Sequence, residues 1–338
     1  MDHYEILEIL NTIELASIFS DKRLDGFECL GMDIGNDDRI YLLFAQTANP
    51  SERRAYKAIC LMVDWDTGGF FGFDVISFGT KKDRFYFVQP LGDGYLLLSD
   101  YAHIVDRFGS PIKKLYLGDG IAQCYVDREN NIITSYCDEG VYGSGRESGG
   151  MAGIVKWSAD GKMLWENKTH VIDDCYAMNI DCDNHLWYYY YNAFNLVHTD
   201  YVNERVFAPR VTGSNGFLIS RKKDKLLFHK GYQKNDRYCV IRVTGQNTLS
   251  KPVDCKMVYS GQTLKTGGFV FAYRRPAQFV FYLFSLKAAK DHRTGRRLTT
   301  TTEISRRHPA RIHSQETSRS AYLRCMTKSS PRPPGFGM

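Results

Sequence analysis

A short hairpin pattern recurs six times along the chain, and it is the feature that most limits how the chain can fold. Each copy has an apolar run, a polar turn and a second apolar run, and turns rich in Asn, Asp and Gly between such runs indicate β-hairpins. The second runs begin at positions 40, 95, 132, 186, 226 and 269, so their mean spacing is about 46 residues. A further apolar run follows each hairpin, at 59–63, 103–105, 154–157, 196–197, 240–241 and 279–282.

A period of this length predicts a β-propeller, in which each repeat is one blade of four antiparallel strands. The chain resembles the repeat propellers of the WD40, YVTN, NHL and TolB-like kind. Over about residues 24–286 it is similar to the six-bladed NHL and TolB-like type. The resemblance implies an architecture and not an activity, because this fold hosts many functions. Two antiparallel β-sandwich domains are the alternative, since regular short strands also suit sandwiches.

The two ends of the chain differ from the repeat region, which we place at residues 21–286. Apolar residues at helical spacing predict a short amphipathic helix within residues 1–20. They are Tyr4, Leu7, Leu10, Ile13 and Ala16. Residues 287–338 are rich in Arg, Thr, Ser and Pro, so we expect a basic, disordered low-complexity tail. Because the sixth repeat stops before its fourth strand, an out-of-frame C-terminus is the other explanation for this tail.

The charge of the chain is divided unevenly between these regions. The whole chain carries +6, but residues 287–338 hold 12 basic and three acidic residues, which leaves the rest at −3. We therefore do not expect the body to bind nucleic acid, and only the tail has the charge for it. No apolar run is long enough to span a membrane, and the acidic start lacks the pattern of a secretion signal. Together with nine cysteines at spacings unlike those of zinc sites, this predicts a cytoplasmic protein with reduced thiols and no membrane partner.

Acidic residues recur just ahead of the first strand of several repeats. Asp25, Asp119 and Asp173 each stand eight residues before an aspartate of that strand, and Asp174 follows the last of them. In a propeller, these positions open on one mouth of the central channel. Converging carboxylates can hold a polar ligand or recruit a divalent cation. Alternatively, each Asp caps its own turn by accepting hydrogen bonds from backbone N–H groups.

A glycine-rich loop at 138–150 adds further candidates at the same mouth. Its five glycines permit mobility or a close approach of backbone to a ligand. It offers Asp138, Glu139, Tyr142 and Arg146 as ligand-contacting side chains. The loop matches neither a dinucleotide-binding fingerprint nor a P-loop. A ligand-gating loop and a plain surface insertion are the two interpretations of it.

Two other patterns resemble functional motifs but also have a structural explanation. Residues 181–185 carry metal-binding residue types, yet they occupy a predicted hairpin turn and lack the Gly and distal Glu of a calcium loop. The aromatic residues at 187–191, with Phe194, could stack nucleic-acid bases. However, alternate residues of a strand point to opposite faces, and packing between blades needs such rings.

These observations favour a binding or scaffolding propeller that holds a polar ligand or a protein partner at the channel mouth. The candidate residues are Asp25, Asp119, Asp138, Glu139, Tyr142, Arg146, Asp173 and Asp174. The alternative is a metal-dependent hydrolase or lyase similar to propeller lactonases, with Asp119, Asp173 and Asp174 as weak candidate ligands of a divalent cation. No catalytic residue and no other cofactor is assigned. An enzyme requires these carboxylates to converge on one point, whereas a binding protein allows them to be spread around the rim.

Overall fold

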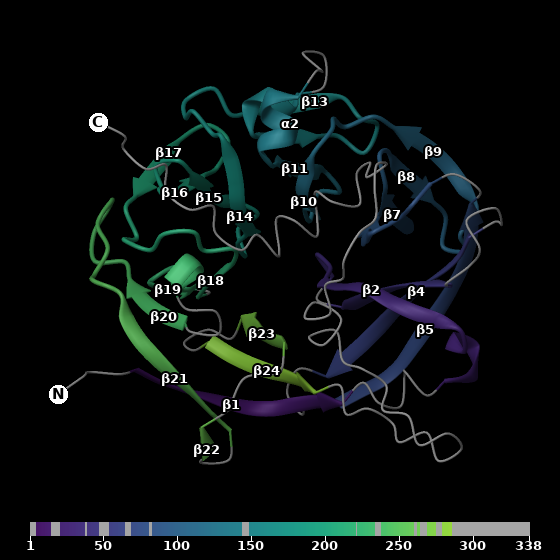
Figure 1. Ribbon diagram of the computed structural model, residues 1–338, viewed down its shortest axis with the longest axis horizontal. Helices are drawn as coiled ribbons and strands as arrows, with labels where there is room; N and C mark the ends of the chain where they lie inside the picture. Colours follow the sequence, from purple (N-terminus) through teal and green to yellow (C-terminus); the bar gives the residue numbers. More distant parts are fainter. Residues whose placement is uncertain are drawn as a thin grey trace, which may run out of the picture.

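The structure is a computed structural model, and strands make up most of its regular elements (Figure 1). It describes residues 5–14, 21–37, 39–46, 54–64, 69–80, 83–143, 149–220, 222–233, 238–259, 262–263, 269–274 and 279–285. Four sheets of four antiparallel strands lie around a common centre, and a fifth four-stranded unit continues into a larger sheet. In each of these five units, strands that are consecutive in sequence are neighbours in space. The fold is a β-propeller.

Each four-stranded unit is one blade. Blade one contains β2 (Phe27–Ile34), β3 (Ile40–Gln46), β4 (Arg54–Asp64) and β5 (Gly69–Thr80). Blade two contains β6 (Phe87–Leu91), β7 (Gly94–Leu98), β8 (Ala102–Val105) and β9 (Pro111–Leu115). Blade three contains β10 (Ile121–Val126), β11 (Ile132–Tyr136), β12 (Ile154–Trp157) and β13 (Met163–Glu166). Blade four contains β14 (Asp174–Ile180), β15 (Leu186–Tyr191), β16 (Leu196–Thr199) and β17 (Glu204–Phe207). Blade five contains β18 (Phe217–Ile219), β19 (Lys225–His229), β20 (Tyr238–Arg242) and β21 (Val253–Tyr259).

The first strands of successive blades line the centre. β6 contacts β2 and β10, and β14 contacts β10 and β18. The later strands of each blade lie progressively farther out (Figure 1). The helices are short, and none among the described residues is long and apolar enough to cross a membrane. They are η1 (Lys22–Leu24), α2 (Asp138–Tyr142), η2 (Gly150–Ala152) and η3 (Gly231–Gln233).

The hairpins predicted from the sequence are confirmed in all five blades. The second strands begin at Ile40, Gly94, Ile132, Leu186 and Lys225, each within one residue of the predicted start. Turn chemistry accounts for this agreement. Asn130 and Asn184 hold φ angles of 60° and 66°, in the left-handed region that Asn tolerates better than most residues. In blade three, an Asp127 carboxylate oxygen accepts hydrogen bonds from the backbone N–H groups of Glu129 and Asn131, at 2.9 and 2.8 Å.

The N-terminal helix predicted within residues 1–20 is wrong for residues 5–14, which form the strand β1 (Glu5–Glu14). β1 pairs in parallel with β21 on one side and with β24 (Phe279–Ser285) on the other. Two neighbouring strands thus supply the backbone hydrogen-bond partners that a helix would have found within itself. The β-branched Ile6, Ile9 and Ile13 also suit a strand. The remaining residues of the predicted helix lie outside the described part of the chain.

The hairpin predicted for the sixth repeat is formed by β23 (Phe269–Arg274) and β24, which pair in antiparallel. This hairpin belongs to an eight-stranded sheet, in which seven strands follow one another in the order β18-β19-β20-β21-β1-β24-β23. The last strand of this sheet, β22 (Gln262–Thr263), pairs with β21. The tail at 287–338 lies outside the described residues, so its disorder and its reading frame stay predictions.

The aromatic run of β15 packs between blades, as the structural interpretation of this run predicts. Trp187 and Tyr189 belong to a buried cluster with blade five, which includes Phe228. Tyr188 and Tyr190 point to the opposite face of the sheet and pack with blade three, against residues such as Ile133. The alternation of side chains along a strand therefore fills both sides of blade four with rings.

Candidate binding site

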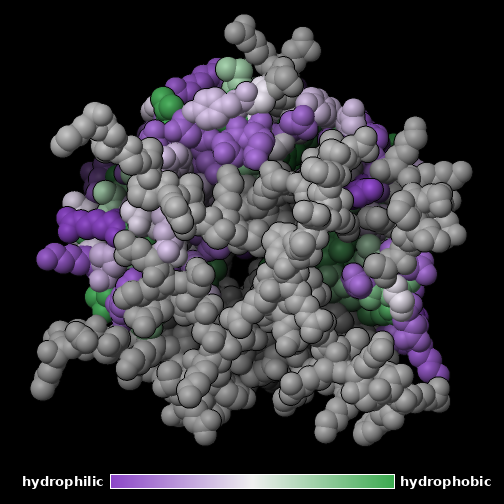
Figure 2. Space-filling model, viewed as in Figure 1, coloured by the Kyte–Doolittle hydropathy of each residue, from purple (hydrophilic) through white to green (hydrophobic). Residues whose placement is uncertain are grey.

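The described candidate residues all lie on one face of the propeller, which we call the loop face. It carries the connections that precede the first strands and those between the second and third strands. The candidates are Asp25 before β2, Asp119 before β10, Asp173 and Asp174 at the start of β14, and Asp138, Glu139 and Tyr142 on α2. Figure 2 shows mainly hydrophilic residues around α2. Arg146 lies outside the described residues.

Two glycines bring the turn of Asp119 against α2. The carbonyl oxygen of Gly120, a residue with φ 62°, accepts a hydrogen bond from the N–H of Cys137 at 2.9 Å. A Cβ atom on Gly140 would lie 2.4 Å from the carbonyl oxygen of Asp119, so a larger residue does not fit there. The sequence suggested that the glycines of 138–150 let the backbone approach a ligand closely. At Gly140, the close approach is between two segments of the chain.

The acidic residues of α2 bind groups in their own turn. An Asp138 carboxylate oxygen accepts a hydrogen bond from the N–H of Glu139 at 3.1 Å. Glu139 in turn accepts one from the thiol of Cys137 at 3.1 Å. One ligand atom from each of these three residues lies within 4.8 Å of the others, a spacing that could hold a metal ion. The local hydrogen bonds of the turn already account for this arrangement.

Tyr142 and Asp173 connect blades three and four across the loop face. The hydroxyl of Tyr142 donates a hydrogen bond to Asp173 Oδ1, and the side-chain amide of Asn192 donates one to Oδ2 at 2.8 Å. Asn192 belongs to the connection between β15 and β16. Of the eight candidates, Tyr142 and Asp173 are thus brought together by a direct side-chain contact between separate segments.

A cluster of aromatic rings continues from this contact toward blade five. The rings of Tyr176 and Tyr191 stack with centroids 6.0 Å apart and an interplanar angle of 13°. Tyr232 of η3 meets Tyr176 edge-on at 6.1 Å, and their hydroxyl groups are hydrogen-bonded. Phe194 contacts all three rings. Tyr191 and Tyr232 are exposed, whereas Tyr176 is half-buried.

These residues form a continuous band that we call the tyrosine stripe. It consists of Tyr142, Asp173, Asn192, Tyr191, Tyr176 and Tyr232. Most of the stripe was not predicted from the sequence, because its members come from four separate segments that meet only when blades pack together. A weak signal was present at Tyr191, which ends the aromatic run where the strand ends. Its side chain is exposed, although the rest of the run is buried.

The local electrostatics keep the phenols of Tyr176 and Tyr142 protonated. Burial raises the pKa of Tyr176, and the hydrogen bond to Tyr232 and the nearby charge of Asp174 raise it further. The hydrogen bond to Asp173 raises the pKa of Tyr142. Both hydroxyls therefore remain neutral and able to donate at neutral pH.

The remaining predicted residues are not drawn into one site. Asp25 is exposed and ends η1, where its N–H donates to the carbonyl oxygen of Lys22 at 3.3 Å. Asp119 is exposed, and Asp174 is buried. Within the described part of the chain, Asp119, Asp173 and Asp174 do not form a group of three metal-ligand atoms.

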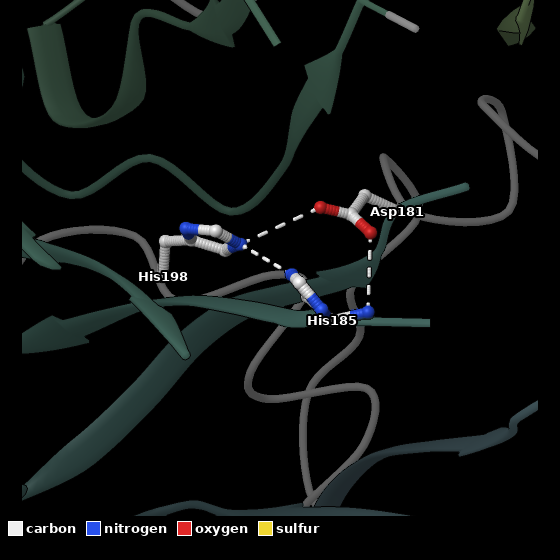
Figure 3. A group of neighbouring side chains, drawn as sticks. All are labelled: Asp181, His185 and His198. Atoms are coloured by element: carbon white, nitrogen blue, oxygen red, sulfur yellow. Dashed lines mark hydrogen bonds and ion pairs between the residues drawn. The ribbon is translucent and has the colours of Figure 1, made fainter. Parts of the chain in front are cut away.

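A second metal-like group lies in the hairpin turn of blade four, on the face opposite the loop face. It comprises Asp181, His185 and His198 (Figure 3). Nδ1 of His185 lies 3.1 Å from Nε2 of His198, which in turn lies 3.6 Å from Asp181. Asp181 and His185 are the first and last residues of the 181–185 pattern noted in the sequence. His198 comes from β16, so only the pairing of β15 with β16 brings it here.

The carboxylate of Asp181 is already saturated with donors. One oxygen accepts from the N–H groups of Asp183 and His185, at 2.9 and 3.1 Å. The other accepts from the indole N–H of Trp187 at 2.9 Å and lies 2.8 Å from the ammonium nitrogen of Lys223. A carboxylate offers about four lone-pair sites, so these contacts use them all. The geometry favours a structural turn over a metal site, which agrees with the hairpin interpretation.

Comparisons by sequence identify no family for the chain. No protein-family model matches it, and no curated protein matches it in sequence. Among solved structures, it is similar to Hsv2 from Kluyvelomyces marxianus, at 12% identity and a TM-score of 0.44. That match covers 66% of this chain and 64% of Hsv2, so this chain spans less than two thirds of that protein's length.

Two further solved structures are similar at the same low level. A catalytically inactive virginiamycin B lyase from Staphylococcus aureus, with quinupristin, has 12% identity and a TM-score of 0.42, and the match covers 67% of this chain and 70% of the lyase. YCF48 bound to D1 peptide has 10% identity and a TM-score of 0.39, with 67% and 80% covered. The propeller assignment rests on the sheets of this chain itself.

Proposed function

We propose that this chain is a six-bladed propeller that acts as a binding protein and not as an enzyme. It holds a polar ligand or a segment of a partner protein on the tyrosine stripe. The observation that carries this proposal is the unbroken series of contacts from Tyr142 on blade three to Tyr232 on blade five. Exposed aromatic side chains with polar ends are the residues that most often anchor binding interfaces.

The arrangement of carboxylates supports binding over hydrolysis. A metal-dependent hydrolase or lyase needs several ligands around one open point. Here the described acidic candidates are spread along the loop face, and those of α2 are engaged in their own turn. Both carboxylate oxygens of Asp173 accept hydrogen bonds, from Tyr142 and Asn192, so this side chain is fixed in place as part of the surface.

Three further features support the finer parts of the proposal. β1, β23 and β24 adjoin one another after blade five, which fits a sixth blade built from both ends of the repeat region. Cys29, Cys60, Cys124 and Cys239 are free thiols, which fits the reducing cytoplasm. The net charge of −3 outside the tail favours a protein or small polar ligand over nucleic acid as the partner of the body.

Comparative capture from a cell lysate tests the proposal. The bait is the full chain in three forms: the unmodified protein, the double variant Tyr142→Ala/Tyr232→Ala, and the control Phe108→Ala. Phe108 is a strongly exposed ring in the turn between β8 and β9, on the opposite face. We expect a set of partners that the unmodified and control proteins retain and the double variant loses, with binding then measured for the purified partner. Equal retention by all three proteins would overturn the proposal.

A further inference from the structure

We propose that the tyrosine stripe recognises the arginine side chain of a partner polypeptide. This inference rests on the proposed function and names the chemistry of its ligand. It follows from the charge of Asp173, from the ring faces beside it, and from the length of the stripe across three blades.

Asp173 supplies negative charge at the centre of the stripe. Both of its carboxylate oxygens bind neutral donors, namely the hydroxyl of Tyr142 and the amide of Asn192. No Lys, Arg or His of the described chain lies within ion-pair distance of it. Neutral donors hold the carboxylate in place without cancelling its charge, so the centre of the stripe attracts a cation. A neutral ligand such as a sugar would leave this charge unbalanced.

The arrangement of the rings in the stripe also suits a cation. The faces of aromatic rings are negative and attract cations that lie within about 6 Å of the ring centroid. The carbonyl oxygen of Tyr191 accepts a hydrogen bond from the N–H of Asp173 at 3.0 Å. Tyr191 and Tyr232 are both exposed, and they meet Tyr176 at interplanar angles of 13° and 81°. One ring therefore lies parallel to Tyr176 and the other stands across it. This combination of a fixed negative charge and two ring orientations suits a planar cation.

The geometry of the stripe favours arginine over lysine, and its length favours a polypeptide over a small ligand. A guanidinium is planar, stacks on tyrosine and can bind a carboxylate through two N–H groups, whereas an ammonium is a compact, strongly hydrated charge. The stripe crosses from α2 on blade three to η3 on blade five, so an extended segment can contact it along its length. A polypeptide that carries arginine fits both properties.

Fluorescence anisotropy with defined peptides tests the inference. The probes are three labelled eight-residue peptides of alternating glycine with arginine, lysine or glutamate, measured against the full chain at physiological salt. We expect the arginine peptide to bind more tightly than the lysine peptide, and the glutamate peptide not to bind. Tyr191→Ala and Tyr232→Ala should each weaken arginine-peptide binding by about 2- to 5-fold, the usual range for an exposed cation–π contact. Tyr232→Phe, which keeps the ring, should stay within about twofold of the unmodified protein.

Controls distinguish this site from general attraction between charges. Asp173→Asn should weaken arginine-peptide binding by at least about threefold. Asp160→Asn, at an exposed carboxylate on the opposite face, should leave it unchanged. Equal binding of arginine and lysine peptides, or no response to the tyrosine variants, would overturn the inference. If the stripe variants lose their captured partners while no arginine peptide binds, the proposed function stands and only the cation chemistry fails.

Discussion

The ammonium nitrogen of Lys223, in the hairpin turn of blade five, lies 2.8 Å from a carboxylate oxygen of Asp181 in the equivalent turn of blade four. The same nitrogen lies 2.7 Å from Asp183. The Asp181 side chain is only 2% exposed, so this pair joins two blades through a carboxylate that is shielded from water. The ends of the hairpins on this face therefore contribute to the cohesion of the ring.

Lys223→Met should lower the free energy of unfolding by about 3 kcal/mol, because it leaves the Asp181 carboxylate buried without its ammonium partner. Urea unfolding of both proteins measures this difference. Lys222→Met is the matched control, since Lys222 is the exposed neighbour of Lys223, and it should change the free energy by less than about 0.5 kcal/mol. Equal losses in the two variants would contradict a specific contact between the blades.

The same carboxylate predicts a pH dependence of stability. Burial alone raises the pKa of Asp181, but the nearby imidazole of His198 and the contacts with Lys223 and Trp187 outweigh it and hold the pKa well below its usual range. An acid whose folded pKa is depressed adds stability above its unfolded pKa, near 4, and loses it as the pH falls further. The difference in Tm between the unmodified protein and Asp181→Asn should thus be largest near pH 7 and shrink below about pH 4. A difference that stays constant from pH 7 to pH 3 would count against this assignment.

Two adjacent tyrosines of β15 should respond in opposite ways to loss of the hydroxyl. The hydroxyl of Tyr189 donates to the carbonyl oxygen of Val211 at 2.5 Å, whereas that of Tyr188 is buried and has no hydrogen-bond partner among the described residues. Tyr189→Phe should lower the free energy of unfolding by about 1 kcal/mol. Tyr188→Phe should be neutral or stabilise by up to about 1 kcal/mol, because it removes a buried polar group that lacks a partner. Thermal unfolding of the two variants gives the comparison, and destabilisation by Tyr188→Phe would mean that its hydroxyl is satisfied.

Gly140→Ala should lower the free energy of unfolding by about 2 kcal/mol or more, since the new Cβ atom on α2 would overlap the carbonyl oxygen of Asp119. Gly216→Ala is the control, because nothing lies within 4 Å of the corresponding Cβ position. It should change stability by no more than about 1 kcal/mol in either direction. Chemical unfolding that gives equal values for both variants would show that the Asp119 turn can move away from α2.

Much of the fold could be predicted because its signals are local. Asn130 and Asn184 occupy left-handed turn positions, and the aspartates before them bind the same turn. Sequence reasoning failed at Glu5–Glu14, where apolar residues at helical spacing form a strand between β21 and β24. Pairing with two distant strands decides that segment, and spacing within the segment does not reveal it.

The candidate site was harder to predict because it depends on contacts between blades. Asp173 was recognised from its place in the repeat and Tyr142 from the glycine-rich loop 138–150, but the partners that connect them to a surface were not. Tyr176 lies on an inner strand and Tyr232 on a loop of the next blade, so their ring contact exists only after packing. A repeat identifies equivalent positions within blades, whereas this surface is formed where non-equivalent positions meet.

Hydroxyl-radical footprinting of the captured complex tests the binding surface most directly. In the free protein, Tyr142, Tyr191 and Tyr232 are 68%, 41% and 48% exposed, and Phe108 on the opposite face is 70% exposed. Our account predicts that the partner slows oxidation of the three tyrosines and leaves Phe108 unchanged. Protection of Phe108 with unchanged oxidation of the tyrosines would contradict it.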